Sequence, residues 1–389
     1  MALFYKKKDI FMEDDSKNIL SILNTRRNMG SFFPAEWYPQ SGIQIAWPHL
    51  NSDWAYVIDE VEAFYLRLAF EIAKRESLLI VAPQSEALKE KLQKHLPQKC
   101  LSNIRIEEIS TNDTWSRDNA FITVYKDNKA CLLDFNFNGW GRKFISSLDN
   151  AINGKLKERQ AVAGTYFNLN DFVLEGGSIE CDGNGTIMTT AQCLLSKERN
   201  PRYNQKEIEE RLKELLEVKQ VLWLSNGHLE GDDTDGHIDT LARFCPDNTI
   251  VYTECTDQSD KHYESLQKMQ EELSLFRNVD GHPYKLVSLP LPDAIYANIH
   301  TGEIVNAENI NGSDVERLPA TYANFLIMNK AVLYPTYNQN NKDEKVGEIL
   351  QGIFPEYEIV GIDCRTLIKQ HGSLHCATMQ FPRGVLNIK

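Results

Sequence analysis

A short stretch of the sequence, Glu230–Phe244, combines residue types that could bind a cation and transfer protons. It reads E-G-D-D-T-D-G-H-I-D-T-L-A-R-F and contains Asp232, Asp233, Asp235, Asp239, His237, Gly231 and Gly236. If the backbone after Gly236 is extended, His237 and Asp239 share one face and Ile238 points to the other. An acid and a base held side by side on a rigid strand predict proton transfer next to a bound cation. The competing interpretation is an exposed acidic turn.

Cys376, close to the C-terminus, is the candidate nucleophile. It follows a loop that contains Gly372, and the apolar residues Met379 and Phe381 come after it. A thiolate beside a histidine can attack an electrophilic carbon, and a nearby cation lowers the pKa of the thiol. Most cysteines are instead small buried apolar side chains. We assign that ordinary role to Cys131, Cys181, Cys193, Cys245, Cys255 and Cys364, and we expect Cys100 to be an exposed thiol.

Further polar residues stand at turns between apolar runs. They lie in the stretches 112–118, 137–141, 174–178 and 370–376. Asp118 follows Arg117, so a surface or structural ion pair is the alternative to a binding role. Glu175 precedes two glycines, and its alternative role is that of a turn carboxylate. Trp115 and Trp140 are by default core aromatic residues.

The elements that would position these residues alternate along the chain. Apolar or alternating runs predict strands at 43–47, 78–82, 104–109, 221–224, 249–254, 285–289 and 358–362. Helical spacing predicts helices over 58–72, capped by Asn51 or Ser52, and over 85–95, 205–216, 261–276 and 343–351. Turn residues predict hairpins over 121–135 and 325–334, the second ended by Pro335, and a hairpin turn at 182–185. The alternation indicates an α/β fold in a single domain.

Two segments stand apart from this pattern. Residues 1–33 are polar and weakly periodic, which predicts an appended N-terminal arm, so that residues 34–389 form the catalytic domain. Residues 293–317 are polar and rich in Asn and Gly, which predicts a surface insertion.

Composition limits the classes of function. The 389 residues are enough for a full core, and a formal net charge of -13 argues against binding to nucleic acid or to anionic membranes. The eight cysteines include no C-x-x-C pair, which favours a reducing compartment. No signal peptide and no apolar run of membrane-spanning length are evident. We therefore expect a cytoplasmic protein with a small cationic partner.

Taken in order, these motifs resemble those of the agmatine deiminases, a family grouped with the bacterial type of peptidylarginine deiminase. The resemblance runs from residue 33 to residue 382. Its motifs are P-A-E-W at 34–37, A-W-P-H at 46–49, D-T-W-S-R-D at 113–118, F-N-G-W-G at 137–141, L-E-G-G-S-I at 174–179, R-N-P at 199–201, D-D-T-D-G-H-I-D at 232–239, L-P-A-T-Y-A-N-F at 318–325 and H-G-S-L-H-C at 371–376. The sequence departs from the commonest family pattern at Asn119-Ala120, where Gly-Pro is usual, and at 370–373, where glycines are common.

The resemblance implies a pentein-type α/β propeller, in which five pseudo-symmetric ββαβ modules surround a central active site. It implies no metal and no organic cofactor, and it leaves a homo-oligomer open. Cys376 matches the nucleophile, and His237 matches the general acid and base. Asp118 and Asp239 match the carboxylates that bind the guanidinium group. The remaining matches are a further carboxylate of the site, Glu175, and an aromatic residue close to the substrate, Trp115.

The implied reaction is the hydrolysis of agmatine to N-carbamoylputrescine and ammonia, a step toward putrescine and the polyamines. Two carboxylates can hold a planar guanidinium flat by paired hydrogen bonds. Cys376 attacks the guanidinium carbon, and His237 protonates the nitrogen that leaves. Water deprotonated by His237 then hydrolyses the amidino-cysteine intermediate. The charge of the substrate could help to form the thiolate.

Two alternatives remain. Within the same family, the substrate could be arginine residues of a peptide, although the lack of an export signal favours the free amine. From a different class, a divalent metal for hydrolysis could be bound by Asp232, Asp233, Asp235, His237, His371, His375 and Cys376.

Overall fold

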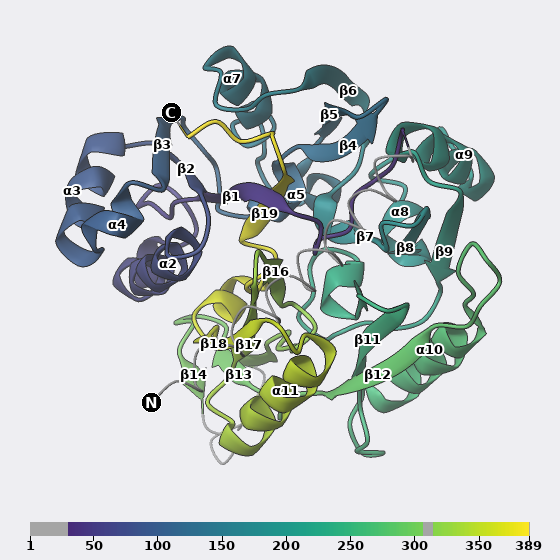
Figure 1. Ribbon diagram of the computed structural model, residues 1–389. Coiled ribbons are helices and arrows are strands. Elements are labelled where there is room, and N and C mark those ends of the chain that lie inside the picture. Colours follow the sequence, from purple (N-terminus) through teal and green to yellow (C-terminus); the bar gives the residue numbers. More distant parts are fainter. Residues whose placement is uncertain (1–29, 306–313, 389) are drawn as a thin grey trace, which may run out of the picture.

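The computed structural model describes residues 30–305 and 314–388 of the chain (Figure 1). Residues 1–29 of the predicted arm and residues 306–313 of the predicted insertion lie outside this part. Phe32 already pairs with Tyr125, because their backbone N–H and C=O groups exchange two hydrogen bonds of 2.9 Å. The chain therefore becomes part of the α/β structure before residue 34, the predicted start of the domain.

Five sheets share one arrangement of strands, and they supply most of the fold. The first is β19-β1-β2-β3, with β19 (Thr378–Pro382), β1 (Gln40–Ala46), β2 (Leu78–Ala82) and β3 (Ile104–Glu108). The others are β4 (Ile122–Lys126), β5 (Lys129–Asn136) and β6 (Thr165–Val173); β7 (Ile179–Cys181), β8 (Thr186–Thr190) and β9 (Gln220–Leu224); β10 (Ala242–Cys245), β11 (Thr249–Glu254) and β12 (Lys285–Pro290); and β16 (Leu326–Met328), β17 (Ala331–Thr336) and β18 (Glu358–Asp363). Each sheet begins with an antiparallel pair, and the next strand is added parallel to it.

A helix connects the parallel neighbours of each of these sheets, as a parallel crossover requires. The crossover helices are α2 (Ile58–Ala73), α7 (Ile152–Glu158), α9 (Gln205–Leu216), α10 (Tyr263–Leu275) and α11 (Asn340–Ile353), and α3 (Ser85–His95) with α4 (Gln98–Leu101) precedes β3. Figure 1 shows these helices on the outside of the molecule and the antiparallel pairs toward its middle. The predicted α/β class is confirmed.

The regular elements follow the sequence pattern closely. The predicted bounds of β2, β11, α3 and α9 agree with the structure. The hairpin of β4 and β5 turns at Asp127 and Asn128, whose φ angles of 49° and 61° match a two-residue turn that twists with its strands. Pro335 does not end β17, which continues to Thr336 and pairs with β18 there. Cys100, predicted to be exposed, is buried under α2 and β2.

The start of α2 differs from the prediction. Neither Asn51 nor Ser52 caps this helix, and the Oγ of Ser52 donates to the carbonyl of His49 instead. A 3-10 turn, η1 (Ala55–Val57), comes first, and α2 begins at Ile58. The cause is Trp54, which is fully buried and donates its Nε1–H to Thr114 Oγ1 at 3.0 Å. Anchoring Trp54 in the core keeps the preceding residues out of the helix.

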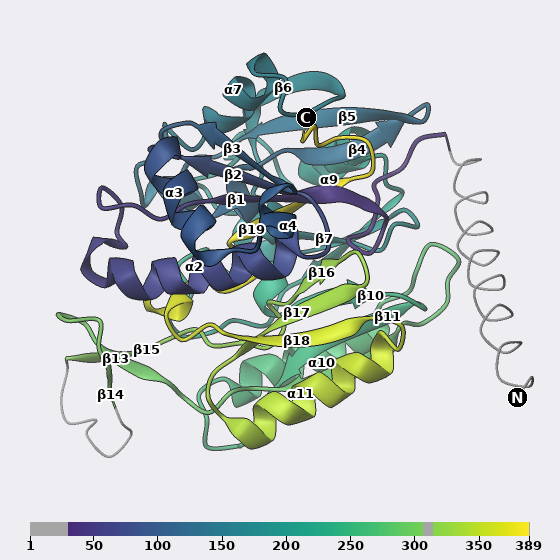
Figure 2. The same cartoon turned by 60° about the vertical axis from the view of Figure 1, so that its left-hand side comes forward.

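The described part of the predicted insertion forms a small antiparallel sheet at the side of the molecule (Figure 2). Its strands are β13 (Tyr296–Asn298), β14 (Ile304–Val305) and β15 (Val315–Arg317). Ile299 and Ile304 are largely exposed there, as expected for a surface segment. No described helix is both long and apolar enough to cross a membrane.

Short turns between the sheets carry the residues that the sequence singled out. They are α5 (Ser116–Asn119), α6 (Gly139–Arg142), η2 (Gly176–Ser178), α8 (Ala191–Leu194), η3 (Ile238–Thr240) and η5 (Leu367–Gln370). Trp115 and Cys376, beside α5 and β19, belong to the same apolar cluster as Leu68 of α2 and Ile80 of β2. The predicted site residues thus stand on loops that a rigid core supports.

Candidate active site

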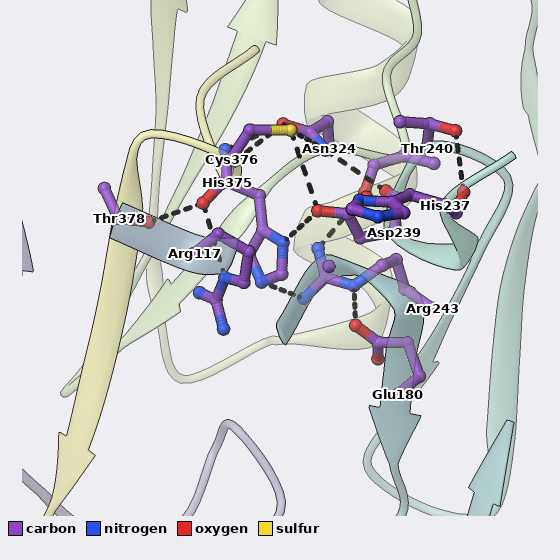
Figure 3. Close-up of polar contacts among 12 residues, drawn as sticks. Arg117, Glu180, His237, Asp239, Thr240, Arg243, Asn324, His375, Cys376 and Thr378 are labelled. Carbon is purple, nitrogen blue, oxygen red and sulfur yellow. Dashed lines mark hydrogen bonds and ion pairs between the residues drawn. The ribbon is translucent and has the colours of Figure 1, made fainter. Parts of the chain in front are cut away.

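Cys376 lies in the turn between η5 and β19, within a network of polar contacts (Figure 3). The Oδ1 of Asn324, just before β16, accepts hydrogen bonds from the backbone N–H of His375 at 2.8 Å and of Cys376 at 3.2 Å. This orients the amide so that its Nδ2 faces Cys376 Sγ at 3.2 Å. Cys376 is 6% exposed, and its sulfur lies next to an N–H donor whose position is fixed.

The segment after Gly236 is not the extended strand that the sequence predicted. Residues Ile238–Thr240 form η3, because the backbone and the hydroxyl of Thr240 both donate to the carbonyl of His237. The turn sends Ile238 into the apolar core. His237 and Asp239 still face one place, since a carbon added to Gly177 would lie 2.6 Å from His237 Nδ1 and 3.3 Å from Asp239 Oδ2.

The other aspartates of this stretch have separate roles. Asp232 closes the loop, because its carboxylate accepts from the backbone of Thr234 at 3.1 Å and of Gly236 at 2.6 Å. Asp235 forms ion pairs with Arg199 and Lys143, whereas Asp233 lines the cavity that contains Cys376. Asp232 and Asp235 therefore stabilise the loop that carries His237.

Asp118 is held by α5 and pointed at the same place. Its Oδ1 accepts from the backbone N–H of Gly177 at 2.9 Å, and its Oδ2 accepts from Trp140 Nε1 at 2.9 Å. The same Oδ1 lies 3.6 Å from His237 Nδ1. Asp118 does not pair with Arg117, whose side chain lies against the carbonyl of His375 instead. The ion-pair interpretation of the sequence is therefore wrong.

Glu175 lies on the other side of the imidazole. Its Oε2 is 3.5 Å from His237 Nε2 and 2.8 Å from Arg199 Nε. Both Glu175 and the side chain of Arg199 are fully buried. The carboxylate is thus an oriented partner of His237 rather than a simple turn residue.

Trp115 forms a wall of the cavity. The ring packs so closely against Gly372 that a carbon added to this glycine would lie 2.3 Å from it. The cavity is lined by Asp53, Asp113, Trp115, Asp118, Trp140, Phe144, Asp232, Asp233, Thr234, His237, Thr240, Gln370, His371, Gly372 and Cys376. It therefore has aromatic walls and several carboxylates around the thiol.

Burial and the neighbouring charges shift the pKa of the site groups. Burial raises the pKa of the Cys376 thiol well above its ordinary value, Asp239 and Asp118 raise it further, and the N–H of Asn324 opposes them. Burial also raises the pKa of Asp118. Burial disfavours the charged form of His237, but Asp118, Cys193 and Glu175 together outweigh it, so the pKa of His237 lies well above its ordinary value. At neutral pH the site therefore holds a thiol beside an imidazolium.

The pKa values of two other carboxylates, Asp239 and Glu175, are lowered instead. Burial alone would raise the pKa of Asp239, but the hydrogen bond and charge of His375 lower it. Burial would also raise the pKa of Glu175, and His237 and Arg199 lower it. Both carboxylates are therefore ionised at neutral pH.

The chain matches known proteins along almost its whole length. Residues 32–382 match the family of Porphyromonas-type peptidyl-arginine deiminases. The chain belongs to this family. It is 33% identical over 369 residues to the agmatine deiminase of Pseudomonas aeruginosa. This match covers 92% of this chain and 97% of that protein.

Solved structures of relatives also resemble this chain in sequence and in fold. A substrate-bound agmatine deiminase from C. jejuni is 37% identical, with a TM-score of 0.79 over 91% of this chain and 97% of that one. A Porphyromonas gingivalis protein, provisionally assigned as an arginine deiminase, is 45% identical, with a TM-score of 0.83 over 92% of this chain and 100% of that one. All six site residues predicted from the sequence fall within the range that matches the peptidyl-arginine deiminase family.

The residues predicted as alternative metal ligands do not lie together in the structure. Among the described residues, potential ligand atoms gather at Glu175–Cys193–His237 and at Glu36–Glu180–His375. Neither group includes Cys376, His371 or an aspartate of the 232–235 loop. In both groups a buried arginine already pairs with a carboxylate, Arg199 with Glu175 and Arg243 with Glu36. The proposed ligand set is thus not assembled.

The sequence predicted no role in the site for several residues that contact the site residues, and Trp140 was expected to be a core aromatic residue. Asn324 contacts Cys376, Trp140 binds Asp118, and Arg199 binds Glu175. His375 was considered only as a metal ligand, yet its Nδ1 lies 2.8 Å from Asp239 Oδ2. The only sequence signal for them was their place in the motifs that resemble those of the family, since their partners lie far away in the chain.

Proposed function

We propose that this chain is an agmatine deiminase, which hydrolyses agmatine to N-carbamoylputrescine and ammonia. The observation that carries the proposal is the convergence of an imidazole and two separate carboxylates on Gly177, with a buried thiol next to one of these carboxylates. Asp239 Oδ2 lies 3.7 Å from Cys376 Sγ, and Asp118 Oδ1 lies 3.6 Å from His237 Nδ1. The curated relatives named agmatine deiminase match over more than nine-tenths of the chain.

Asp118 and Asp239 hold the guanidinium group in this mechanism. Asp239 Oδ1 is buried and has no hydrogen-bond partner among the described residues, so it is available to an N–H donor. Burying an acceptor without a partner costs about 1–3 kcal/mol, and a bound cation removes that cost. A planar guanidinium between the two carboxylates presents its carbon to Cys376.

The charge of the substrate activates the nucleophile. The pKa of Cys376 is raised by burial and by two negative neighbours. A cation bound between Asp118 and Asp239 neutralises those neighbours, so the thiol releases its proton to the solvent and becomes the thiolate. The N–H of Asn324 then donates to the sulfur anion at 3.2 Å.

His237 carries the protons. The thiolate adds to the guanidinium carbon, and the C–S bond forms as one C=N bond becomes single. His237, an imidazolium held by Asp118 and Glu175, gives its proton to the terminal nitrogen, which leaves as ammonia. The neutral imidazole then takes a proton from water, the oxygen adds to the amidino carbon, and the C–S bond breaks to release the ureido product and the thiol.

The cavity favours an amine over an amino acid at the far end of the substrate. Besides Asp118, its described lining includes Asp53, Asp113, Asp232 and Asp233, and no lysine or arginine. An α-carboxylate would meet repulsion there, whereas the ammonium group of agmatine would be attracted. The P. gingivalis relative is the reason to test arginine and arginyl peptides as well.

The five repeated sheets support the finer description of the fold. A strand order that recurs five times, each time with an external crossover helix, is what five pseudo-symmetric modules of a pentein-type propeller require. We place residues 34–389 in one such catalytic domain. The eight cysteines, all buried, fit a reducing cytoplasm.

The test measures ammonia and ureido product from agmatine, free arginine and a blocked arginyl peptide. We expect agmatine to be turned over fastest and Cys376→Ala to abolish every signal. A control variant, Cys131→Ala, removes a buried thiol of β5 and should keep activity. Faster turnover of the peptide than of agmatine would contradict the substrate assignment, and turnover by Cys376→Ala would contradict the mechanism.

A further inference from the structure

A set of buried charged residues lies beneath Asp239, and the proposed reaction leaves it without a role. Its members are Glu36, Glu180, Arg243 and His375, each no more than 8% exposed. Glu36 comes from the P-A-E-W stretch before β1, and Arg243 comes from β10. Figure 3 shows the ring of His375 between Asp239 and Arg243.

One side of the His375 ring binds Asp239. The Nδ1 of His375 lies 2.8 Å from Asp239 Oδ2. An ionised carboxylate only accepts hydrogen bonds, so Nδ1 carries the proton. Asp239 Oδ2 also faces Cys376 Sγ at 3.7 Å, whereas Asp239 Oδ1 has no partner among the described residues. The contact with His375 therefore fixes the orientation of the Asp239 carboxylate beside Cys376 and leaves Asp239 Oδ1 free to accept another hydrogen bond.

The other side of the ring is fixed just as firmly. His375 Nε2 lies 2.8 Å from Glu36 Oε2 and 3.0 Å from Arg243 Nη2. Glu36 is anchored by the backbone N–H of Ile327 at 2.6 Å, and Arg243 donates to the carbonyl of Phe325 at 2.5 Å. Phe325 immediately precedes β16, and Ile327 lies within it. The imidazole cannot turn without breaking contacts on both of its edges.

We propose that His375 is a positioning residue for the deimination reaction. Its Nδ1–H binds Asp239 Oδ2 and so holds the carboxylate beside Cys376, which leaves Asp239 Oδ1 free to accept from the guanidinium group. Glu36 and Arg243 hold the ring that does so. This inference rests on the proposed function only in that Asp239 binds the substrate cation.

The charges around this pair give the pH dependence a definite sign. The groups that face Asp239 or His375 are Cys376, His237, Asp118, Arg117, Arg243, Glu36 and Glu180. Burial alone would raise the pKa of Asp239, and the hydrogen bond from His375 is the largest effect that lowers it. Without this bond the carboxylate protonates at higher pH. Binding of the cation should then be lost sooner as the pH falls.

Two substitutions separate the two edges of the ring. In His375→Asn the amide nitrogen stands at the same bond count from Cβ as Nδ1, so it can still donate to Asp239. In His375→Gln the amide nitrogen stands at the place of Nε2, so Glu36 keeps a partner and Asp239 loses its own. A hydrogen bond to a charged group is worth about one to two pKa units. The Gln variant should therefore bind a cation about 10- to 100-fold more weakly on the acid side.

The experiment measures agmatine binding by calorimetry from about pH 4 to about pH 8, which starts near the ordinary pKa of an aspartate, about 3.9, and extends past a rise of one to two units. It uses Cys376→Ala, which does not turn the ligand over, alone and combined with each His375 substitution. We expect the acid limb of binding to move to higher pH with His375→Gln and to stay in place with His375→Asn. Equal shifts in both variants, or none in either while both are folded, would overturn the proposal.

A second measurement does not depend on the ligand. A raised pKa of Asp239 destabilises the folded chain as the pH rises above the unfolded pKa, because the native carboxyl then binds more protons. The Tm of His375→Gln should thus fall relative to that of His375→Asn as the pH increases. If Cys376→Ala binds no agmatine, the proposed function fails, and this difference in Tm still decides the role of His375.

A matched control exists elsewhere in the chain. His262, which is 2% exposed, places its Nδ1 2.8 Å from Asp260 Oδ1, and neither residue lines the cavity that contains Cys376. His262→Gln breaks a histidine–aspartate contact of the same length. It should leave the acid limb of agmatine binding unchanged. A shift of the same size there would show a general effect of stability and would overturn the assignment to His375.

Discussion

Three of the site groups lie against the backbone at Gly177, so one added methyl group tests the geometry directly. A Cβ on Gly177 would lie 2.6 Å from His237 Nδ1, 2.8 Å from Asp118 Oδ1 and 3.3 Å from Asp239 Oδ2. Distances under about 3 Å are repulsive for a carbon atom. Gly177 is not among the glycines with positive φ, so alanine meets no backbone strain. Any effect of Gly177→Ala therefore comes from the crowded side chains.

The neighbours of this methyl group have little room to move. Asp118 is fixed by hydrogen bonds of 2.9 Å from Gly177 N and from Trp140. Adding a methyl group to a well-packed place costs about 1–3 kcal/mol. If the displaced His237 and Asp118 lose that much in the transition state, kcat/KM falls roughly 5- to 150-fold.

The assay is ammonia release from agmatine together with thermal unfolding. Gly154→Ala in α7 is the control, because a carbon added there meets no atom within 4 Å. That substitution should stabilise the helix by about 0.4–1 kcal/mol and leave kcat/KM unchanged. Parent-like kcat/KM in a folded Gly177→Ala protein would refute the arrangement of the site.

Two further predictions concern charge. Asp118→Asn removes the carboxylate that most strongly raises the pKa of His237, so the alkaline limb of kcat, measured as a pH–rate profile with agmatine, should move to lower pH; an unmoved limb would contradict the pairing. Glu76, bonded to Asn329 Nδ2 at 2.6 Å, has its pKa raised by burial to about 8. A raised acid pKa means that the native state binds more protons than the unfolded chain between the ordinary pKa and about 8, so stability falls as the pH rises through that window. Glu76→Gln should therefore show a higher Tm than the parent at high pH and no gain at low pH, and an equal Tm at high pH would count against this explanation.

The pattern of apolar and polar residues along the chain predicted most of the secondary structure. The apolar runs of β2 and β11 and the amphipathic spacing of α9 are read from neighbours in the chain, and their predicted bounds agree with the structure. The start of α2 was missed because Trp54 is anchored by Thr114, 60 residues away. The turn η3 was missed because Thr240 folds back onto His237 by hydrogen bonds that strand periodicity does not reveal.

The identities of the six predicted site residues came from the sequence, because a thiol, an imidazole and carboxylates beside glycines form a recognisable order along the chain. Their partnership is a tertiary property. Asn324 faces Cys376 across 52 residues, Arg199 faces Glu175 across 24, and Glu36 faces His375 across 339. Hydrogen bonds and ion pairs act over a few ångströms of space, whatever the separation in sequence. The types of chemistry were therefore determined by the sequence itself, whereas the orientation and charge of each group were decided only by the fold that buries them together.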